Sequence, residues 1–307
     1  MSKNQLLEGK RIILTGASSG IGKALAYGLA DLGAYMGLMG LSADELRNIS
    51  EEITAKGDQS TFVFTNVMHY EEVEQAIDKM VQTMGGVDVL INNAGVANPN
   101  ILPESPEDID TIIDTNMKGP LYCSLAVLPR FIEQESGSII ITSSVSSLES
   151  TVSYLPYNVH YVTSKAGLNM YTHAMAARLE DKSIRVNALL PGFVDTQMIQ
   201  HVQPELLERA GVMEPDELIP FYAFFASDMS KDITGRVLPV ELFKSVLKFT
   251  SKLSPEQVES WETLEPLITA RFSDPKYQVY GDAVNILQAN HELLMMYISW
   301  GGSETSS

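Results

Sequence analysis

Short apolar segments alternate with longer amphipathic segments over the first two thirds of the chain. The apolar segments are typical of buried strands, and we expect strands at Arg11–Thr15, Ala34–Met39, Thr61–Thr65, Val87–Ile91, Ser138–Ile141, Ile184–Leu189 and Arg236–Val240. The segments between them place apolar residues at helical spacing, which predicts helices at 20–33, 42–56, 70–84, 106–134, 159–181, 204–210 and 215–226. This alternation predicts an α/β fold with a doubly wound parallel sheet covered on both faces.

The pattern changes after Glu241, where no further strand is expected. Ser254 and Pro255 are typical of an N-cap and first helical position, so they predict a helix to about Ala270. A second helix is expected from Pro275 to Trp300, and one apolar stripe on it must be buried against the main domain or a partner chain. We therefore expect a main domain over 1–241, a helical extension over 242–300 and a disordered tail over 301–307.

Composition narrows the classes of function. The chain has 307 residues, a net charge of −18 and a pI near 4.6, so neither nucleic acid nor an anionic membrane is an expected partner. Its N-terminus lacks a signal-peptide core, and no segment has the roughly 18 uncharged apolar residues of a membrane span. The single cysteine, Cys123, excludes an internal disulfide framework, and the histidines show no metal-ligand spacing. We expect a cytoplasmic protein without a metal site.

The segment Thr15–Gly22 joins the first predicted strand to the first helix and contains three glycines. Glycines at this position allow a tight turn and close backbone approach, so that the helix N-terminus can face a pyrophosphate. Taken alone, the segment is also compatible with a plain strand-to-helix connection.

Further motifs follow in a fixed order. After Thr-Gly-x-x-x-Gly-x-Gly come Asn92–Gly95, Asn116–Gly119, Thr142–Ser144, Tyr161-x-x-x-Lys165 and Pro191–Thr196. In spacing and order this set resembles the short-chain dehydrogenase/reductase family, over about Leu6 to Glu241. The resemblance implies a Rossmann fold, with dinucleotide binding and catalysis within 1–241. It also implies an NAD- or NADP-dependent oxidoreductase that interconverts a small-molecule ketone and a secondary alcohol by hydride transfer.

The resemblance assigns catalysis to Asn116, Ser144, Tyr161 and Lys165. A phenol titrates near 10, so Tyr161 needs a stabilised anion to act as general acid/base, and the Lys165 ammonium and the oxidised nicotinamide would both lower its pKa. Ser144 would hydrogen-bond the substrate oxygen. Lys165 would also hold the nicotinamide ribose, and Asn116 would anchor a water that links Lys165 to solvent.

The same resemblance assigns cofactor contacts to Gly16, Ser18, Ser19, Gly20, Ile21, Gly22, Leu41, Asn66, Val67, Asn93, Ala94, Gly95, Tyr161, Lys165, Pro191, Gly192, Val194 and Thr196. The choice between NAD and NADP stays open, because neither an acidic residue near Gly40 nor an arginine near Leu41 is present. The lack of a visible phosphate clamp favours NAD.

The segment from Ser144 to Tyr161 is longer than the family pattern, so Ser147 is an alternative catalytic serine. Tyr154 and Tyr157 in this segment, and Met198 after the Pro-Gly motif, are candidate substrate contacts. A surface loop with packed aromatic residues explains the tyrosines equally well.

The residues Pro239–Leu242 stand where the family has an acidic residue and two glycines, in a region that commonly contributes to a tetramer. A homodimer or a homotetramer is therefore expected, and the helical extension is either a lid over the substrate or an oligomer interface. Two other readings stay open. One is a non-catalytic relative that senses a dinucleotide or binds a partner, and the other is an epimerase or dehydratase with transient oxidation.

Overall fold

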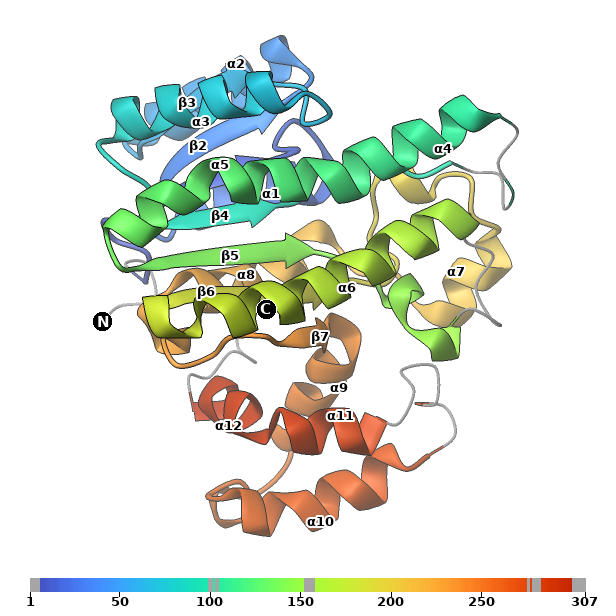
Figure 1. The fold of residues 1–307 in the computed structure, drawn as a ribbon. Helices are drawn as coiled ribbons and strands as arrows, with labels where there is room; N and C mark the ends of the chain where they lie inside the picture. Colours follow the sequence, from blue (N-terminus) through green and yellow to red (C-terminus); the bar gives the residue numbers. More distant parts are fainter. Residues whose placement is uncertain are drawn as a thin grey trace.

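The computed structural model describes residues 6–98, 102, 105–151, 158–274, 277 and 283–299. Its centre is one parallel sheet with the strand order β3-β2-β1-β4-β5-β6-β7 (Figure 1). The strands are β1 (Arg11–Thr15), β2 (Tyr35–Gly40), β3 (Ser60–Phe64), β4 (Val89–Asn92), β5 (Gly137–Thr142), β6 (Ile184–Leu190) and β7 (Val237–Pro239). The order reverses beside β1, as a doubly wound sheet requires. The predicted fold class is confirmed.

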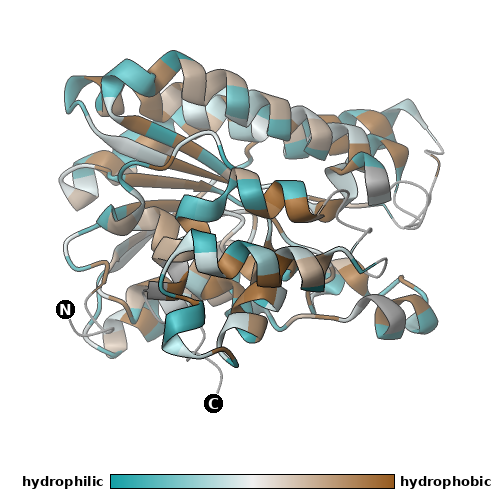
Figure 2. Ribbon diagram, turned by 90° about the horizontal axis from the view of Figure 1, so that it is seen from below, coloured by the Kyte–Doolittle hydropathy of each residue, from teal (hydrophilic) through white to brown (hydrophobic). Residues whose placement is uncertain are grey.

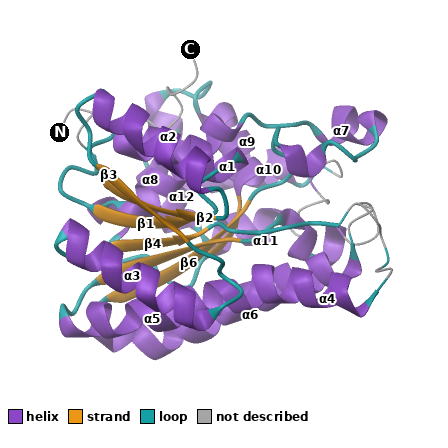
Figure 3. Ribbon diagram, turned by 90° about the horizontal axis from the view of Figure 1, so that it is seen from above, coloured by secondary structure: helices purple, strands orange, loops and turns teal. Residues whose placement is uncertain are grey.

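Helices cover both faces of the sheet. One face carries α3 (Tyr70–Met84), α5 (Gly119–Glu133) and α6 (Val159–Leu179), and the other carries α1 (Gly20–Ala30), α2 (Ala43–Ala55) and α8 (Ile219–Ala226) (Figure 3). Strands buried on both faces read as continuous apolar runs, and in Figure 2 they are mainly brown. Because buried strands are apolar along their whole length, the apolar segments of the sequence located the strands.

The predicted helix over 106–134 is not regular along its length. It consists of α4 (Pro106–Ile113), a π-helical turn (Asp114–Lys118) and α5. Ser105 caps α4 with a reciprocal capping box to Asp108. The wider turn contains Asn116, and π-helical turns are frequent at functional positions. A short helix, α7 (Pro204–Ala210), follows the last motif.

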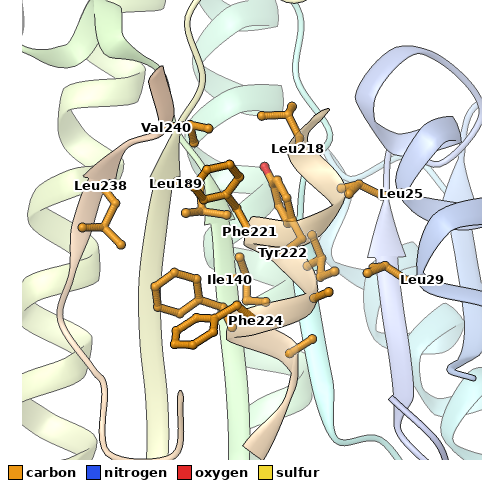
Figure 4. Packing of buried hydrophobic residues seen from close by; sticks show 14 of the residues in the cluster. Leu25, Leu29, Ile140, Leu189, Leu218, Phe221, Tyr222, Phe224, Leu238 and Val240 are labelled. Atoms are coloured by element: carbon orange, nitrogen blue, oxygen red, sulfur yellow. The ribbon is translucent and has the colours of Figure 1, made fainter. Parts of the chain in front are cut away.

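Aromatic side chains of α8 belong to the core on this face of the sheet. Phe221, Tyr222 and Phe224 lie in the same buried cluster as Leu25 and Leu29 of α1, and Figure 4 shows Phe221 beside Leu189 of β6. The Tyr222 hydroxyl lies 2.7 Å from Oγ1 of Thr142, at the carboxyl end of β5. The buried core beside α8 therefore extends to the carboxyl ends of the strands, where the motif residues lie.

The helical extension differs in detail from the prediction. A helix that the sequence did not predict, α9 (Val240–Thr250), begins directly after β7, and residues Pro255–Gln257 form only a 3₁₀ turn. The next helix, α10 (Trp261–Phe272), begins later than expected because Ser260 caps it. The predicted single helix over 275–300 is, in the described residues, α11 (Ala283–Ala289) and α12 (His291–Ser299).

The predicted apolar stripe of the last helix consists of Ile286, Ala289, Leu293, Met296 and Trp300. The buried face differs from it, because Ala289 is exposed whereas Leu287 and Leu294 are fully buried, and this face packs within the chain. Leu287, Leu293 and Leu294 are buried in the same core cluster as the aromatic residues of α8. Met296 and Ile286 pack against that cluster. Figure 1 shows the extension beside β7, on one side of the sheet. The Trp300 end of the stripe lies outside the described residues.

Candidate active site

A groove of about 510 Å³ crosses the carboxyl ends of the central strands. Every predicted cofactor residue except Gly22 lines it, together with Ser144 and Met198. Ligands of open α/β sheets bind at this edge, where the strand order reverses. Among the described residues, nothing beyond Ile199 lines the groove, so the described part of the extension contributes no lining residue.

Close packing explains the glycines of the first turn. Gly16 has a φ of +67°, and a Cβ there would lie 2.8 Å from Cα of Ala94. A Cβ on Gly22 would collide with the carbonyl oxygen of Gly16, which explains why Gly22 is required although it lies behind the lining. The Thr15 hydroxyl oxygen accepts hydrogen bonds from the backbone N–H groups of Asn93 (2.9 Å) and Ala94 (3.0 Å). The first turn and the Asn-Asn-Ala-Gly segment therefore form one rigid wall, which fits the close approach of a pyrophosphate to the start of α1.

Among the described residues that line the groove, none at the end of β2 is a cation that could hold a phosphate. Leu41 lines the groove and is 61% exposed. Lys23 of α1 and Arg47 of α2 are both paired with acids of α2: Lys23 lies 3.4 Å from Glu45, and Arg47 lies 3.1 Å from Asp44. Both acids belong to the first turn of α2.

Tyr161 and Lys165 lie one turn apart on α6 and are both buried in the wall of the groove. Asn158 caps the helix by accepting from the backbone N–H groups of His160 and Tyr161, which fixes where the first turn begins. Nζ of Lys165 donates to the carbonyl oxygen of Thr142 at 2.8 Å, which joins α6 to β5.

The electrostatics of this pair differ from the expectation. Burial raises the pKa of Tyr161, and a hydrogen bond from Ser144 partly lowers it. Burial also lowers the pKa of Lys165 to about 8, so its ammonium is itself disfavoured. Nζ lies 5.7 Å from the centre of the Tyr161 ring. In the protein alone, desolvation therefore raises the Tyr161 pKa, opposite to the lowering expected from Lys165.

Ser144 and Ser147 occupy different places. Ser144 follows β5, lines the groove and is hydrogen-bonded to Tyr161. The Ser147 hydroxyl instead donates to the Ser144 carbonyl oxygen, outside the groove lining. The geometry therefore favours Ser144. Tyr154 and Tyr157 lie outside the described residues, whereas Met198 lines the groove.

Asn116 is fully buried behind the groove. Its amide makes a reciprocal pair with the Val96 backbone, accepting from N–H and donating to C=O at 2.7 Å each. A Cβ on Gly95 would lie 3.3 Å from Oδ1 of Asn116 and 3.5 Å from Nζ of Lys165. The Asn116 side chain thus fixes the wall segment next to Lys165.

Sequence reasoning missed Glu241 as a residue of this site. Its carboxylate accepts from the N–H of Gly192, and a Cβ on Gly192 would collide with it. Oε2 is buried with no hydrogen-bond partner in the part of the chain described. Burial raises the Glu241 pKa to about 7, although the nearby Lys244, itself paired with Glu217, opposes this. The available signal was an acidic residue directly after the last strand, at the start of α9.

No group of His, Cys, Asp and Glu side chains in the described ranges is arranged to hold a metal ion. Within those same ranges, none of the helices combines the length and the apolar character needed to cross a membrane.

Comparisons with known proteins agree with this geometry. The family model for short chain dehydrogenases matches residues 10–206. A 3-oxoacyl-[acyl-carrier-protein] reductase of Staphylococcus epidermidis is 37% identical over 243 residues, covering 75% of this chain and 97% of its own. The oxidoreductase UcpA of Salmonella typhimurium is 36% identical over 245 residues, covering 75% of this chain and 92% of its own.

Solved structures lead to the same family. A short-chain alcohol dehydrogenase of Sinorhizobium meliloti, described as putative, has a TM-score of 0.71 at 29% identity and covers 77% of this chain and 96% of its own. A 3-oxoacyl-[acyl-carrier protein] reductase of Brucella melitensis has a TM-score of 0.70 at 27% identity and covers 78% of this chain and 92% of its own. The chain therefore belongs to the short-chain dehydrogenase/reductase family and is an NAD(P)-dependent oxidoreductase.

Proposed function

We propose that this enzyme interconverts a ketone and a secondary alcohol, with Tyr161 as the general acid/base. The observation that carries the proposal is the juxtaposition in one groove of the Tyr161 hydroxyl, its hydrogen-bond partner Ser144 and the buried Lys165. A phenol, a hydroxyl donor and an ammonium together can protonate a carbonyl oxygen and stabilise the charge that develops on it.

Each residue has a distinct part in this proposal. A bound nicotinamide dinucleotide supplies or accepts the hydride. Tyr161 gives its proton to the substrate oxygen during reduction and takes it back during oxidation. Ser144 donates a hydrogen bond to the same oxygen. Lys165, held by Thr142, stabilises the tyrosinate that remains, and Asn116 keeps the wall beside Lys165 in place.

NAD is the proposed cofactor in preference to NADP. A 2′-phosphate near Leu41 would meet an exposed leucine and the acidic first turn of α2, which contains Asp44 and Glu45. Lys23 and Arg47 are already paired with those acids. An NADP site needs an unopposed cation at this position.

A 3-oxoacyl thioester is a second candidate substrate, favoured by the names of the relatives and by the apolar lining around Val96, Met198 and Ile199. An acidic carrier protein would approach a chain of net charge −18, which disfavours docking at low salt. A 3-oxoacyl group on a short neutral thioester tests the chemistry without the carrier.

Replacing Tyr161 by Phe tests the proposal. Turnover of a ketone panel that includes the neutral 3-oxoacyl thioester should fall by about 10²–10⁴-fold, since the proton donor is lost. NADH affinity should stay close to that of the wild type. Retained turnover in the variant would contradict the role of Tyr161. Wild-type conversion without net NADH consumption would favour an epimerase, and absence of any conversion would favour a non-catalytic dinucleotide-binding protein.

A further inference from the structure

A second serine, Ser146, contacts the oxygen of Ser144 directly. The Ser146 hydroxyl donates to Oγ of Ser144 at 3.0 Å, and the Ser146 backbone N–H donates to the same oxygen at 3.2 Å. Ser146 is fully buried and does not line the groove. No part of the function described above uses its side chain.

The contact with Ser146 restricts what Ser144 can do, because a serine hydroxyl makes only a limited number of hydrogen bonds. A hydroxyl oxygen has two acceptor positions and one proton to donate. Ser146 occupies both acceptor positions of Ser144, so Ser144 is left with its proton alone. The partner on the groove side is Tyr161, whose oxygen can therefore only accept from Ser144.

We propose that Ser146 is a positioning residue that holds Ser144 as a hydrogen-bond donor into the groove, toward Tyr161 in the free enzyme and toward the substrate oxygen that Tyr161 protonates once substrate is bound. The proposal rests on the function proposed for Tyr161 and Ser144. With Ser144 as the donor, Tyr161 does not have to donate its own proton to Ser144. Ser144 keeps its own proton throughout, and the proton that moves is that of Tyr161.

The surrounding frame holds the segment in this orientation. Asn169, one turn beyond Lys165 on α6, accepts from the Ser143 hydroxyl at 2.7 Å and donates to Oγ of Ser147 at 2.7 Å. On the other side, the Val145 N–H donates to the Pro191 carbonyl oxygen at 3.0 Å. The donors of Ser146 are therefore held in a fixed place relative to Tyr161. Chains of hydroxyls that donate in one direction also strengthen one another.

Three variants of Ser146 separate its hydroxyl from its volume. Ser146→Ala removes the donor, Ser146→Cys keeps a similar shape with a weak donor, and Ser146→Thr restores a hydroxyl. Ser138→Ala is the matched control, because Ser138 is a buried serine on β5 whose hydroxyl donates to the Phe225 carbonyl oxygen instead. If Ser146→Ala fails to fold, the Cys variant takes its place.

Two measurements apply to each variant. The first is kcat and NADH affinity. The second is the tyrosinate absorbance of each variant minus that of the same variant carrying Tyr161→Phe, which titrates Tyr161 alone and needs no substrate.

Ser146→Ala should lower kcat about 2- to 10-fold, the value of one hydrogen bond, with NADH affinity unchanged. Its Tyr161 should titrate at higher pH by up to about one unit, because Ser144 no longer donates reliably. The Thr variant should recover most of both effects, and Ser138→Ala should show neither. An unchanged Tyr161 titration in Ser146→Ala would overturn the proposal even if the enzyme reduces ketones. Loss of kcat in Ser138→Ala equal to that in Ser146→Ala would also overturn it, since the effect would then be general destabilisation.

Discussion

The groove and the helical extension bury different kinds of side chain. Around the groove, buried polar side chains are hydrogen-bonded: Ser146 donates to Ser144, and Lys165 donates to the Thr142 carbonyl oxygen. In the extension, the buried side chains are mainly apolar, such as Leu264 and Ile268 of α10. Buried polar groups are costly unless each is paired, whereas apolar burial stabilises without directional demands. The groove is therefore organised for chemistry, and the extension is organised for packing.

The relatives divide the molecule in a similar way. The family model ends at residue 206, and the Staphylococcus relative covers 75% of this chain. The two regions meet where Glu241, at the start of α9, accepts from Gly192 in the groove wall. A substitution on either side of this contact should affect one region and spare the other.

The largest effect on stability is expected in the extension. Leu264→Ala removes a fully buried side chain and should lower the free energy of unfolding by about 2–5 kcal/mol, with kcat of the folded enzyme unchanged. Urea unfolding and turnover on the same preparations measure both quantities. Leu125→Ala, at an exposed position of α5, is the control and should change the free energy of unfolding by about 0.5 kcal/mol or less. A kcat loss in the folded Leu264→Ala enzyme would show that the extension takes part in catalysis.

The contact between the two regions should respond to pH. Burial raises the pKa of Glu241 from 4.5 to about 7. The wild type therefore loses stability as pH rises between these values, because the unfolded chain releases the Glu241 proton there while the folded protein keeps it. Glu241→Gln cannot ionise. Relative to the wild type, the free energy of unfolding of Glu241→Gln should therefore increase as the pH rises. The difference should reach up to about 3 kcal/mol above pH 7.

Urea unfolding at several pH values between 4.5 and 8 measures this gain. Glu51→Gln, at an exposed position of α2, is the control and should show no such slope. Parallel pH profiles for Glu241→Gln and the wild type would mean that Glu241 ionises normally.

The smallest effect is expected within the groove, at the end of β2. Leu41→Arg places a cation where the 2′-phosphate would lie and should shift the ratio of NADPH to NADH affinity toward NADPH by about tenfold. Leu41→Gln, polar but uncharged, should leave the ratio nearly unchanged. Equal ratios in the arginine variant and the wild type would place the adenosine ribose away from Leu41.

The strands of the sheet and the Tyr161–Lys165 pair of the groove could be predicted from the sequence. Buried parallel strands are continuous apolar runs, and a Tyr and a Lys four residues apart necessarily share a helix face. The placement of Glu241 could not be predicted, because its partner Gly192 is 49 positions away and only the folded chain brings them together. The start of α9 was missed because Val240 and Leu242 continue the apolar pattern of β7. The direction of the Ser146 hydrogen bond depends on one local turn, which no residue pattern encodes.

Calorimetric titration of the wild-type enzyme with NADH and with NADPH tests the central claim, that the groove is a nicotinamide dinucleotide site. Gly22→Ala is the control, since its Cβ would collide with the Gly16 carbonyl oxygen and displace the turn, and its folding is checked by circular dichroism. We predict one site per chain that binds NADH more tightly than NADPH and is lost in folded Gly22→Ala. Binding of neither nucleotide by the folded wild type, or equal binding by the control, would contradict the account.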